Sequence, residues 1–531
     1  MRFEVSSETL ASVPHVAWLG LALVIIQLVY SATKKPKLNL PGPRGWPYVG
    51  NLFQLGEDAA QTYYKWSQKY GPVYKVQLGE REVVIINTAQ AAKELLTDLG
   101  SIYISRPLFY TFHTVVSSTA GYTIGTSPWD ESCKRKRRAA ATALNRVAVQ
   151  SYVPIIDRET LSLIEDLYHA RSAAIEPFAY FQRLALNVSL TVNYGSRLDK
   201  VGDQLLAEIV EVETHVANFR SVSNSPADYL PIVRYFPSMG RNSKAFAGSI
   251  RARRDVYMSR LLNDLKQRVR EGTDVPCITG NILKDPEAKL TDQELSSICL
   301  SMVSAGLDTL ANTFIWSMGF LAKRPDIQQK AYDEMYKVYQ GAIPRSDEEA
   351  VEYITALHKE CSRYFSVLKL ALPKATLGDS TYKGAHIPSG TTVFLNAWAI
   401  HQDRDRYGDV ENFRPERFLE PGEENKQAHY SFGAGRRMCA GVHLANRELY
   451  VAFCKVIHFF KIEPSLDPAE QEYDMNPATG CANPKGLSSS PKPFKVRFVP
   501  RDAAAIEGWI ENEKSRTELQ MAASISNNKQ G

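Results

Sequence analysis

One cysteine in a glycine-rich loop constrains the fold of this chain more than any other feature. The loop spans residues 431–441, with the sequence SFGAGRRMCAG, and a helical pattern follows from Val442. Gly433 and Gly435 permit a tight, partly left-handed backbone that can lie close against a flat ring. Backbone N–H groups converge near a helix N-terminus, and this arrangement favours an anionic sulfur on Cys439. The loop therefore predicts a thiolate that can bind a metal.

A haem group matches the features of this loop. Arg437 can reach a negatively charged propionate, and Gly441 leaves room beside the sulfur. A thiolate on haem iron favours cleavage of the O–O bond, which histidine-ligated globins do not carry out. The alternative is a buried structural thiol or half of a disulfide. The spacing Phe-x-x-Gly-x-Arg-x-Cys-x-Gly is met at Phe432, Gly435, Arg437, Cys439 and Gly441. This joint spacing favours the haem ligand, which implies monooxygenase chemistry.

Length and composition limit the possible classes of protein. A chain of 531 residues with 44% hydrophobic residues can bury a large core. The seven cysteines are an odd number without a Cys-x-x-Cys pair, which fits a reducing compartment. A net charge of +5 is small for this length, so the composition predicts no nucleic-acid partner.

An apolar stretch near the N-terminus predicts a membrane anchor. Residues 13–32 are about long enough to cross a bilayer as a helix. Three lysines follow immediately, so the bulk of the chain is expected to face the cytosol. A cleaved secretory signal is the alternative, but residues 1–12 are not basic overall and the cysteine pattern disagrees with export. Residues 33–50 would form a basic and proline-rich hinge.

A long apolar helix is predicted from a capping box at residues 291–294 to about Lys323. Within it, Ala305 and Thr309 are four residues apart and share one face. The Thr309 hydroxyl can bond the carbonyl of Ala305 and loosen the helix locally, while Gly306 removes bulk beside them. Gly306, Asp308 and Thr309 all have low helix propensity. Their occurrence close together favours a functional opening that fits dioxygen and a water.

The proline-rich hinge, the long helix, two arginine motifs and the cysteine loop occur in an order that resembles the cytochrome P450 superfamily. The resemblance covers about residues 40–500. It implies a mainly α (α+β) fold with small β-sheets, with one catalytic domain at residues 51–500 after an N-terminal transmembrane helix. It also implies haem b, O2 as co-substrate, and electrons from a separate NADPH-cytochrome P450 reductase, with cytochrome b5 as a second candidate donor. The expected location is the endoplasmic reticulum membrane, with a single membrane pass.

The same resemblance assigns roles outside the cysteine loop. Thr309 would order the water that delivers protons during oxygen activation, and Asp308 would connect that water to solvent. Glu360, Arg363 and Arg417 would form a buried network that fixes the segment before the cysteine loop. Taken alone, a glutamate and an arginine three residues apart are a common surface pair, so this role depends on the resemblance.

The sequence leaves open which cations bind the haem propionates. In the family, a tryptophan on the relevant helix is commonly followed four residues later by an arginine. Here Trp129 is followed at that spacing by Cys133, and Lys134 comes next, so Lys134 is the candidate. The basic run at residues 134–138 would either dock an acidic electron-transfer partner or form a solvated face.

Several shorter runs indicate a closer relationship. They are residues 105–107, 109–113, 123–128, 367–373 and 444–450. These runs resemble the fungal phenylacetate hydroxylase family, whose members hydroxylate the ring of small arylacetic acids. The implied substrate is a small aromatic molecule, either an arylacetate or a secondary metabolite. Oxidative coupling or dehydrogenation of an aromatic natural product by the same haem centre is the alternative. The Asp308–Thr309 pair disfavours a third reading, a non-catalytic haem binder.

An arylacetate requires a cation in the pocket, because an unpaired carboxylate in a dry cavity is unfavourable. The candidate cations are Arg106, His113, Lys369 and Lys374. Each of them could instead bind a propionate or reach solvent. The candidate apolar contacts are Phe109, Phe112 and Ala305. The two phenylalanines could equally be filler under the loop that crosses the pocket.

Further patterns concern the rest of the fold. Four short runs rich in β-branched or apolar residues predict strands at residues 73–78, 82–87, 367–373 and 391–395. Residues 203–260 contain two helical patterns separated by prolines, and they are expected to form a roof over the pocket. Residues 501–531 are polar and charged without a clear core face, and they are expected to be a flexible tail.

Overall fold

The computed structural model describes Trp18 and residues 38–528, apart from residues 120, 236–243, 286, 288 and 422–428. Except for Trp18, the expected membrane anchor at residues 13–32 lies outside the described residues. The anchor therefore stays a prediction. Among the described helices, α11 (Asp292–Ala322) is long and apolar enough to cross a membrane, but 72% of its most apolar window is buried inside the protein.

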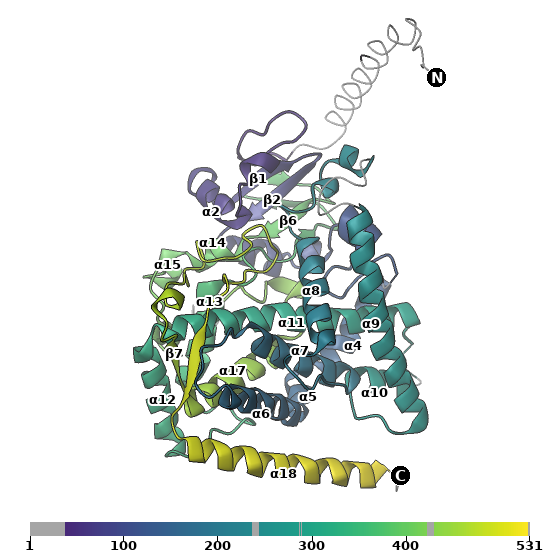
Figure 1. The fold of residues 1–531 in the computed structure, drawn as a ribbon. Helices are drawn as coiled ribbons and strands as arrows, with labels where there is room; N and C mark the ends of the chain where they lie inside the picture. Colours follow the sequence, from purple (N-terminus) through teal and green to yellow (C-terminus); the bar gives the residue numbers. More distant parts are fainter. Residues whose placement is uncertain are drawn as a thin grey trace, which may run out of the picture.

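Helices make up most of the fold (Figure 1). Besides α11, the longer ones are α2 (Ala59–Tyr70), α4 (Glu131–Ala143), α6 (Val153–His169), α7 (Phe178–Tyr194), α8 (Gln204–Asn218), α9 (Lys244–Glu271), α12 (Pro325–Tyr339), α13 (Glu352–Phe365), α17 (Val442–Phe459) and α18 (Ala503–Asn528). The shorter ones are α3 (Ala89–Ala92), α5 (Arg146–Ser151), α10 (Ile278–Lys284), α14 (Ala397–His401) and α15 (Arg404–Tyr407). The expected mainly helical fold is confirmed.

Three small sheets complete the fold. The strands are β1 (Val73–Leu78), β2 (Arg81–Ile86), β3 (Lys374–Ala375), β4 (Ser380–Tyr382), β5 (Ala385–Ile387), β6 (Thr392–Leu395), β7 (Phe460–Pro464) and β8 (Val496–Pro500). The largest sheet has the order β1-β2-β6-β3, in which β2 and β6 are parallel and the other pairs are antiparallel. The other two sheets are the pairs β4-β5 and β7-β8.

One of the expected strands is wrong. β1, β2 and β6 form close to where the sequence predicts them. Residues 367–373 instead form an irregular wall with an isolated bridge between Leu370 and Asn396. The chain leaves α13 through Ser366 in a left-handed conformation and reaches Pro373, which has no N–H to donate. Few ladder hydrogen bonds can form between these two points.

α11 runs through the centre of the molecule (Figure 1). The predicted capping box is present, because the Thr291 side chain accepts from the Glu294 N–H and the Glu294 side chain accepts from the Thr291 N–H. Apolar residues of α11 join those of α6, α7, α13 and α17 in the largest core cluster. Burial on nearly all sides explains why α11 lacks a polar face and can carry a functional opening inside the protein.

The C-terminal segment differs from the expectation of a flexible tail at residues 501–531. Residues 503–528 form α18, which lies along one edge of the molecule (Figure 1). Ile506, Trp509 and Ile510 are buried against the main core, and the Trp509 ring lies 4.7 Å from the ring of Phe459. These three apolar residues form one short face on a mostly polar helix. Such a short face is hard to separate from a polar tail by pattern alone.

We expect Trp509→Ala to lower the free energy of unfolding by about 3 kcal/mol, because it removes a large side chain from a packed core. Denaturant titration followed by circular dichroism measures this change. Trp46→Ala is the matched control, because Trp46 is 57% exposed and its loss should change stability by less than about 0.5 kcal/mol. Equal effects of the two substitutions would show that α18 does not stabilise the fold.

Candidate active site

A cavity of about 300 Å³ lies between α11, the loop before α4 and the cysteine loop. It collects candidate residues that are far apart in sequence. Those that line it are Arg106, Ala305, Thr309, Lys374, Phe432, Arg437, Cys439 and Gly441. Most of the remaining lining is apolar, so the cavity suits a flat cofactor and a small aromatic molecule.

The cysteine loop has the backbone that its glycines predict. Gly433 and Gly435 have φ values of 75° and 68°, and the Cys439 N–H donates to the Phe432 carbonyl at 3.0 Å. A Cβ added to Gly435 would overlap the carbonyl oxygen of Leu96, whereas one added to Gly433 would meet nothing within 4 Å. Gly435 is therefore required by both conformation and contact. Gly433 is favoured by its left-handed conformation alone.

The environment of Cys439 differs in one respect from the sequence prediction. The residue is exposed to the cavity, and α17 begins three residues later with Gly441 as its N-cap. Desolvation raises the pKa of the Cys439 thiol and outweighs the lowering by the Gly441 N–H and by Arg137. Without a positive charge at the sulfur, burial therefore favours the neutral thiol. A bound metal ion would supply the missing positive charge, because a coordinating thiol loses its proton.

Cations gather near the cysteine loop. Arg437 donates to the carbonyls of Ile104, Ile124 and Ser127, each at 3.0 Å, and Arg106 donates to the carbonyl of Pro373 at 2.8 Å. In both arginines the buried Nε has no hydrogen-bond partner in the described part of the chain. These two donors remain available to a ligand.

The charges in this group act on one another. Desolvation, and then repulsion by the neighbouring cations, lowers the pKa values of Arg106 and Lys374 well below their ordinary values. Arg137 contributes to both shifts and also lines the cavity. We call Arg106, Arg137, Lys374 and Arg437 the cation cluster. A ligand with two negative charges would relieve this repulsion, so the propionates of haem fit the cavity here.

The structure does not bring Lys134 to the cavity. Its Nζ pairs with the exposed Glu131 at 2.6 Å and lies 5.9 Å from the Trp129 ring. The Trp129 ring is also 6.0 Å from the Arg437 guanidinium. The cation that reaches the cavity from α4 is Arg137, one helical turn after the buried Cys133. Counting one helical turn from Cys133 would have identified Arg137, whereas counting from Trp129 pointed to Lys134.

The opening in α11 has the predicted hydrogen bond. The Thr309 hydroxyl donates to the Ala305 carbonyl at 2.8 Å, and the Thr313 hydroxyl repeats this pattern with the Thr309 carbonyl at 2.8 Å. Gly306 has a second role, because a Cβ there would overlap the Ser189 hydroxyl on α7. An alanine there would force the Ser189 hydroxyl to turn away, so Gly306 favours close packing of α7 and α11 in addition to leaving room in the cavity.

Asp308 does not line the cavity directly. Desolvation and then the nearby Glu213 raise the pKa of Asp308 to about 7, while Arg220 opposes the shift. A carboxyl with this pKa can both hold and release a proton near neutral pH. The sequence analysis missed Glu213 and Arg220. Glu213 lies on the buried face of α8 with Ile209, Val212 and Val216, and a carboxylate on an apolar face was the signal available.

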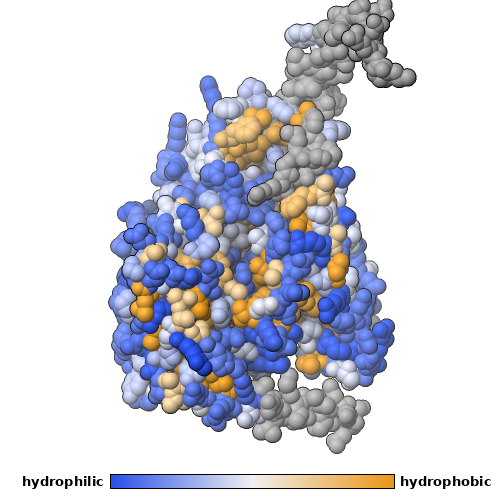
Figure 2. Space-filling view, in the orientation of Figure 1, coloured by the Kyte–Doolittle hydropathy of each residue, from blue (hydrophilic) through white to orange (hydrophobic). Residues whose placement is uncertain are grey.

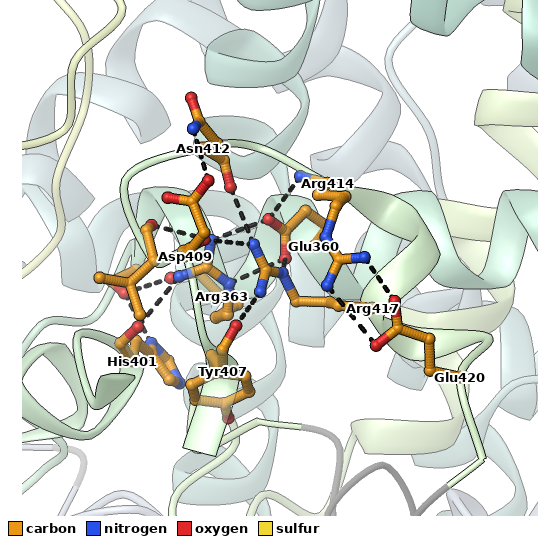
Figure 3. A network of polar contacts seen from close by, with 11 residues as sticks. Glu360, Arg363, His401, Tyr407, Asp409, Asn412, Arg414, Arg417 and Glu420 are labelled. Atoms are coloured by element: carbon orange, nitrogen blue, oxygen red, sulfur yellow. Dashed lines mark hydrogen bonds and ion pairs between the residues drawn. The ribbon is translucent and has the colours of Figure 1, made fainter. Parts of the chain in front are cut away.

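The predicted network of Glu360, Arg363 and Arg417 is confirmed (Figure 3). Arg363 donates to both carboxylate oxygens of Glu360 at 2.8 Å, and the Nε of Arg417 lies 3.1 Å from the same carboxylate. The side chains of Glu360 and Arg363 are fully buried. Arg363 also donates to the His401 carbonyl at 2.9 Å, so the network joins α13 to the segments before the cysteine loop.

A direct contact continues from α13 to the cysteine loop. The Ser431 hydroxyl donates to the Ser362 carbonyl at 2.8 Å, one residue before Arg363. The His401 Nε2 accepts from the Tyr430 N–H at 2.9 Å. The start of the cysteine loop is therefore attached to the same helix that carries Glu360.

Four of the candidate substrate contacts lie outside the cavity. Lys369 pairs with Asp58 at 2.6 Å and donates to the Pro477 carbonyl at 2.9 Å. The His113 Nδ1 accepts from the Phe109 N–H at 2.9 Å, and its Nε2 faces the Thr126 carbonyl at 3.2 Å. These interactions make Lys369 and His113 structural residues.

The two aromatic candidates also have structural surroundings. Phe109 lies under the Arg81 guanidinium at 5.0 Å. Phe112 is buried in a core cluster with residues of α7, α8 and α9. The sequence alone could not show that Arg106 lines the cavity while Phe109 and Phe112 do not, because all three belong to the loop that was expected to cross the pocket.

Comparisons with known proteins agree with this site. The cytochrome P450 family model matches residues 40–498. Phenylacetate 2-hydroxylase of Emericella nidulans is 48% identical, over 92% of this chain and 95% of that protein. The 3-hydroxyphenylacetate 6-hydroxylase of the same organism is 44% identical, over 92% of this chain and 93% of that protein. A cytochrome P450 monooxygenase of Mycosarcoma maydis is 47% identical, over 96% of this chain and 95% of that protein.

The chain therefore belongs to the cytochrome P450 family and is a cytochrome P450 monooxygenase. Membership in this family implies a haem-iron cofactor and the use of O2. The unpartnered donors of the cation cluster, the glycine-rich backbone and the sulfur at the cavity fit that cofactor.

We expect Glu360→Ala to destabilise the protein by about 3 to 5 kcal/mol, because it leaves two buried guanidinium groups without their carboxylate. Denaturant unfolding and the haem content of the purified protein measure the effect. Glu420→Ala is the control, because Glu420 pairs with Arg414 at an exposed position and should contribute about 1 kcal/mol or less. A Glu360→Ala protein with normal haem content and stability would contradict the role of the network.

We also expect Gly435→Ala to prevent stable haem incorporation, because the added Cβ would displace the Leu96 backbone against which the loop packs. Gly433→Ala should incorporate haem, since it carries only the left-handed conformational penalty of about 1 to 2 kcal/mol. Absorbance of the haem band per protein compares the two variants. Equal haem contents would show that the Leu96 contact does not shape the loop.

Proposed function

We propose that this monooxygenase hydroxylates the aromatic ring of a small arylacetic acid. The observation that carries the proposal is the shared cavity, in which the Cys439 sulfur and the Thr309 opening are joined by a mainly apolar lining. Two relatives at 48% and 44% identity are named for the hydroxylation of phenylacetate and 3-hydroxyphenylacetate. Their names support the same substrate class for this chain.

Residues of the cavity have distinct roles in the proposed reaction. Cys439 would hold the iron, and the cation cluster would neutralise the propionates. When bound there, haem supplies the activation of O2 and the transfer of one oxygen atom. The apolar lining excludes bulk water and packs the substrate ring. These roles divide the cavity into a polar end for the cofactor and an apolar region for the substrate.

Proton delivery falls to α11. The Thr309 hydroxyl donates to the Ala305 carbonyl and so keeps its oxygen free to accept a hydrogen bond from a water. Asp308, with its pKa near 7, would replace the proton that this water gives up. Protons would thus reach the cavity by an ordered route, while the apolar lining blocks uncontrolled access.

Electrons would come from an NADPH-cytochrome P450 reductase, with cytochrome b5 as a second donor. The support is the basic surface of α4, where Lys134, Arg135 and Arg138 are exposed. Acidic partners are steered toward such surfaces by long-range attraction. On the same helix Arg137 faces the cavity, so a partner docked on α4 would lie close to the cofactor.

Membrane attachment in the endoplasmic reticulum is part of the proposal. An apolar patch covers the end of the molecule where β1 and β2 lie (Figure 2). Phe53 and Trp46 are 69% and 57% exposed, and their rings are 6.3 Å apart. Both follow the expected anchor closely in sequence. Exposed aromatic residues near an anchor are suited to the interface of a bilayer.

The purified protein, incubated with reductase, NADPH and isotopically labelled O2, should convert phenylacetate or 3-hydroxyphenylacetate to a product that carries one labelled oxygen. Mass spectrometry of the extracted acids measures this product. Cys439→Ala is the control and should yield no product and no thiolate-type Soret band in the reduced carbon monoxide complex. Coupled dimers in place of a hydroxylated monomer would instead support oxidative coupling, and no product from any arylacetate would reject the proposal.

A further inference from the structure

Arg220 is a cavity cation that stands apart from the cation cluster. It follows the C-terminal end of α8, whereas the cluster lies beside the cysteine loop. We propose that Arg220 binds the carboxylate of the substrate and so determines the preference for arylacetic acids. This assignment rests on the proposed function and adds the residue that recognises the acid group.

The position of Arg220 suits a ligand-binding role. It lines the active-site cavity and also a second, smaller cavity, and Ala371 is common to both linings. Arg220 therefore lies where the two cavities approach one another. A carboxylate held at this point would leave its aromatic ring free to enter the larger, mainly apolar cavity.

The hydrogen-bonding groups of Arg220 are largely unused. Its Nε approaches the carbonyl of Val216, one turn earlier, at a long distance of 3.5 Å. Neither Nη atom has a hydrogen-bond partner among the residues that the structure describes. The guanidinium packs 5.1 Å from the Phe112 ring, which fixes its plane without occupying its edge. The planar fork is thus available for a bidentate contact with a carboxylate.

The other candidate cations are already committed. Lys369 is neutralised by Asp58 and lies in the smaller cavity, outside the larger one. Arg106 donates to backbone carbonyls and, with Lys374, belongs to the cation cluster beside the cysteine loop. If the cluster holds the propionates, Arg220 is the cation left for a substrate within the described lining of the cavity.

The charges around Arg220 favour an additional anion. Glu213 and Asp308 lie close enough to stabilise its charge. Glu213, however, accepts from the Tyr257 hydroxyl at 2.6 Å and from the Ser304 hydroxyl. Asp308, with a pKa near 7, is protonated in a large part of the molecules at neutral pH. Arg254 adds a second positive charge near Arg220, so Glu213 and a partly protonated Asp308 compensate the two arginines only in part, and a substrate carboxylate would complete the pairing.

The test compares an acid with its neutral analogue. Equilibrium dialysis and the substrate-induced spin-state change of the holoenzyme measure the binding of phenylacetate and phenylacetamide. Arg220→Gln should weaken phenylacetate binding by about 10- to 100-fold, the loss expected for a hydrogen-bonded charge pair. Binding of phenylacetamide should change much less. Arg220→Lys should fall between, because an ammonium keeps the charge but loses the fork.

A matched control is available in Arg81. Arg81 stacks on Phe109 as Arg220 stacks on Phe112, but it lies outside both cavities. Arg81→Gln should leave the preference for the acid unchanged. If Arg220→Gln fails to retain haem, Arg220→Met keeps the aliphatic stem over Phe112 and gives the same comparison.

Two negative results have different meanings. If the wild-type protein prefers the acid and the Arg220 variants keep that preference, Arg220 is not the carboxylate partner, and the proposed function stands. If the wild-type protein binds neither arylacetates nor their amides and forms no product from them, the proposed function fails and the Arg220 assignment fails with it.

Discussion

The buried carboxylate of Glu360 is the interaction on which the active site depends. It neutralises two arginines that would otherwise be charged and unpaired in the core, and these arginines bind backbone carbonyls on both sides of the network. Because Ser362 on the same helix bonds the first residue of the cysteine loop, the start of that loop is positioned by α13. α13, a helix in the core, thus helps to position the cysteine loop.

The cavity combines two electrostatic environments. Near the cysteine loop, several cations repel one another and their pKa values fall, which makes this end receptive to anions. Beside α11, two carboxyl groups and Arg220 lie together, and burial raises the pKa of Asp308 to about 7, so this acid can exchange its proton near neutral pH. One end is suited to holding charge permanently and the other to moving protons. An apolar lining between them keeps the two functions separate.

The sequence predicted the parts of the site that have a strong local pattern. The cysteine loop, the Thr309–Ala305 hydrogen bond and the Glu360 network follow from spacing and resemblance. Arg137 and Arg220 were missed because each reaches the cavity by tertiary packing, which no local pattern encodes. α18 was missed for a related reason, since a helix with one short apolar face resembles a polar tail until its contact with Phe459 is seen.

The contact between Gly306 and Ser189 has a consequence for the range of substrates. A Cβ at position 306 would meet the Ser189 hydroxyl, so α7 supports α11 closely at this point and limits how far this part of the cavity wall can move back for a larger molecule. The connection after α8 contributes Arg220 to the cavity lining and contains short helical turns at Pro226–Asp228 and Pro231–Tyr235. Differences in substrate size among relatives are therefore expected in this connection more than in α11.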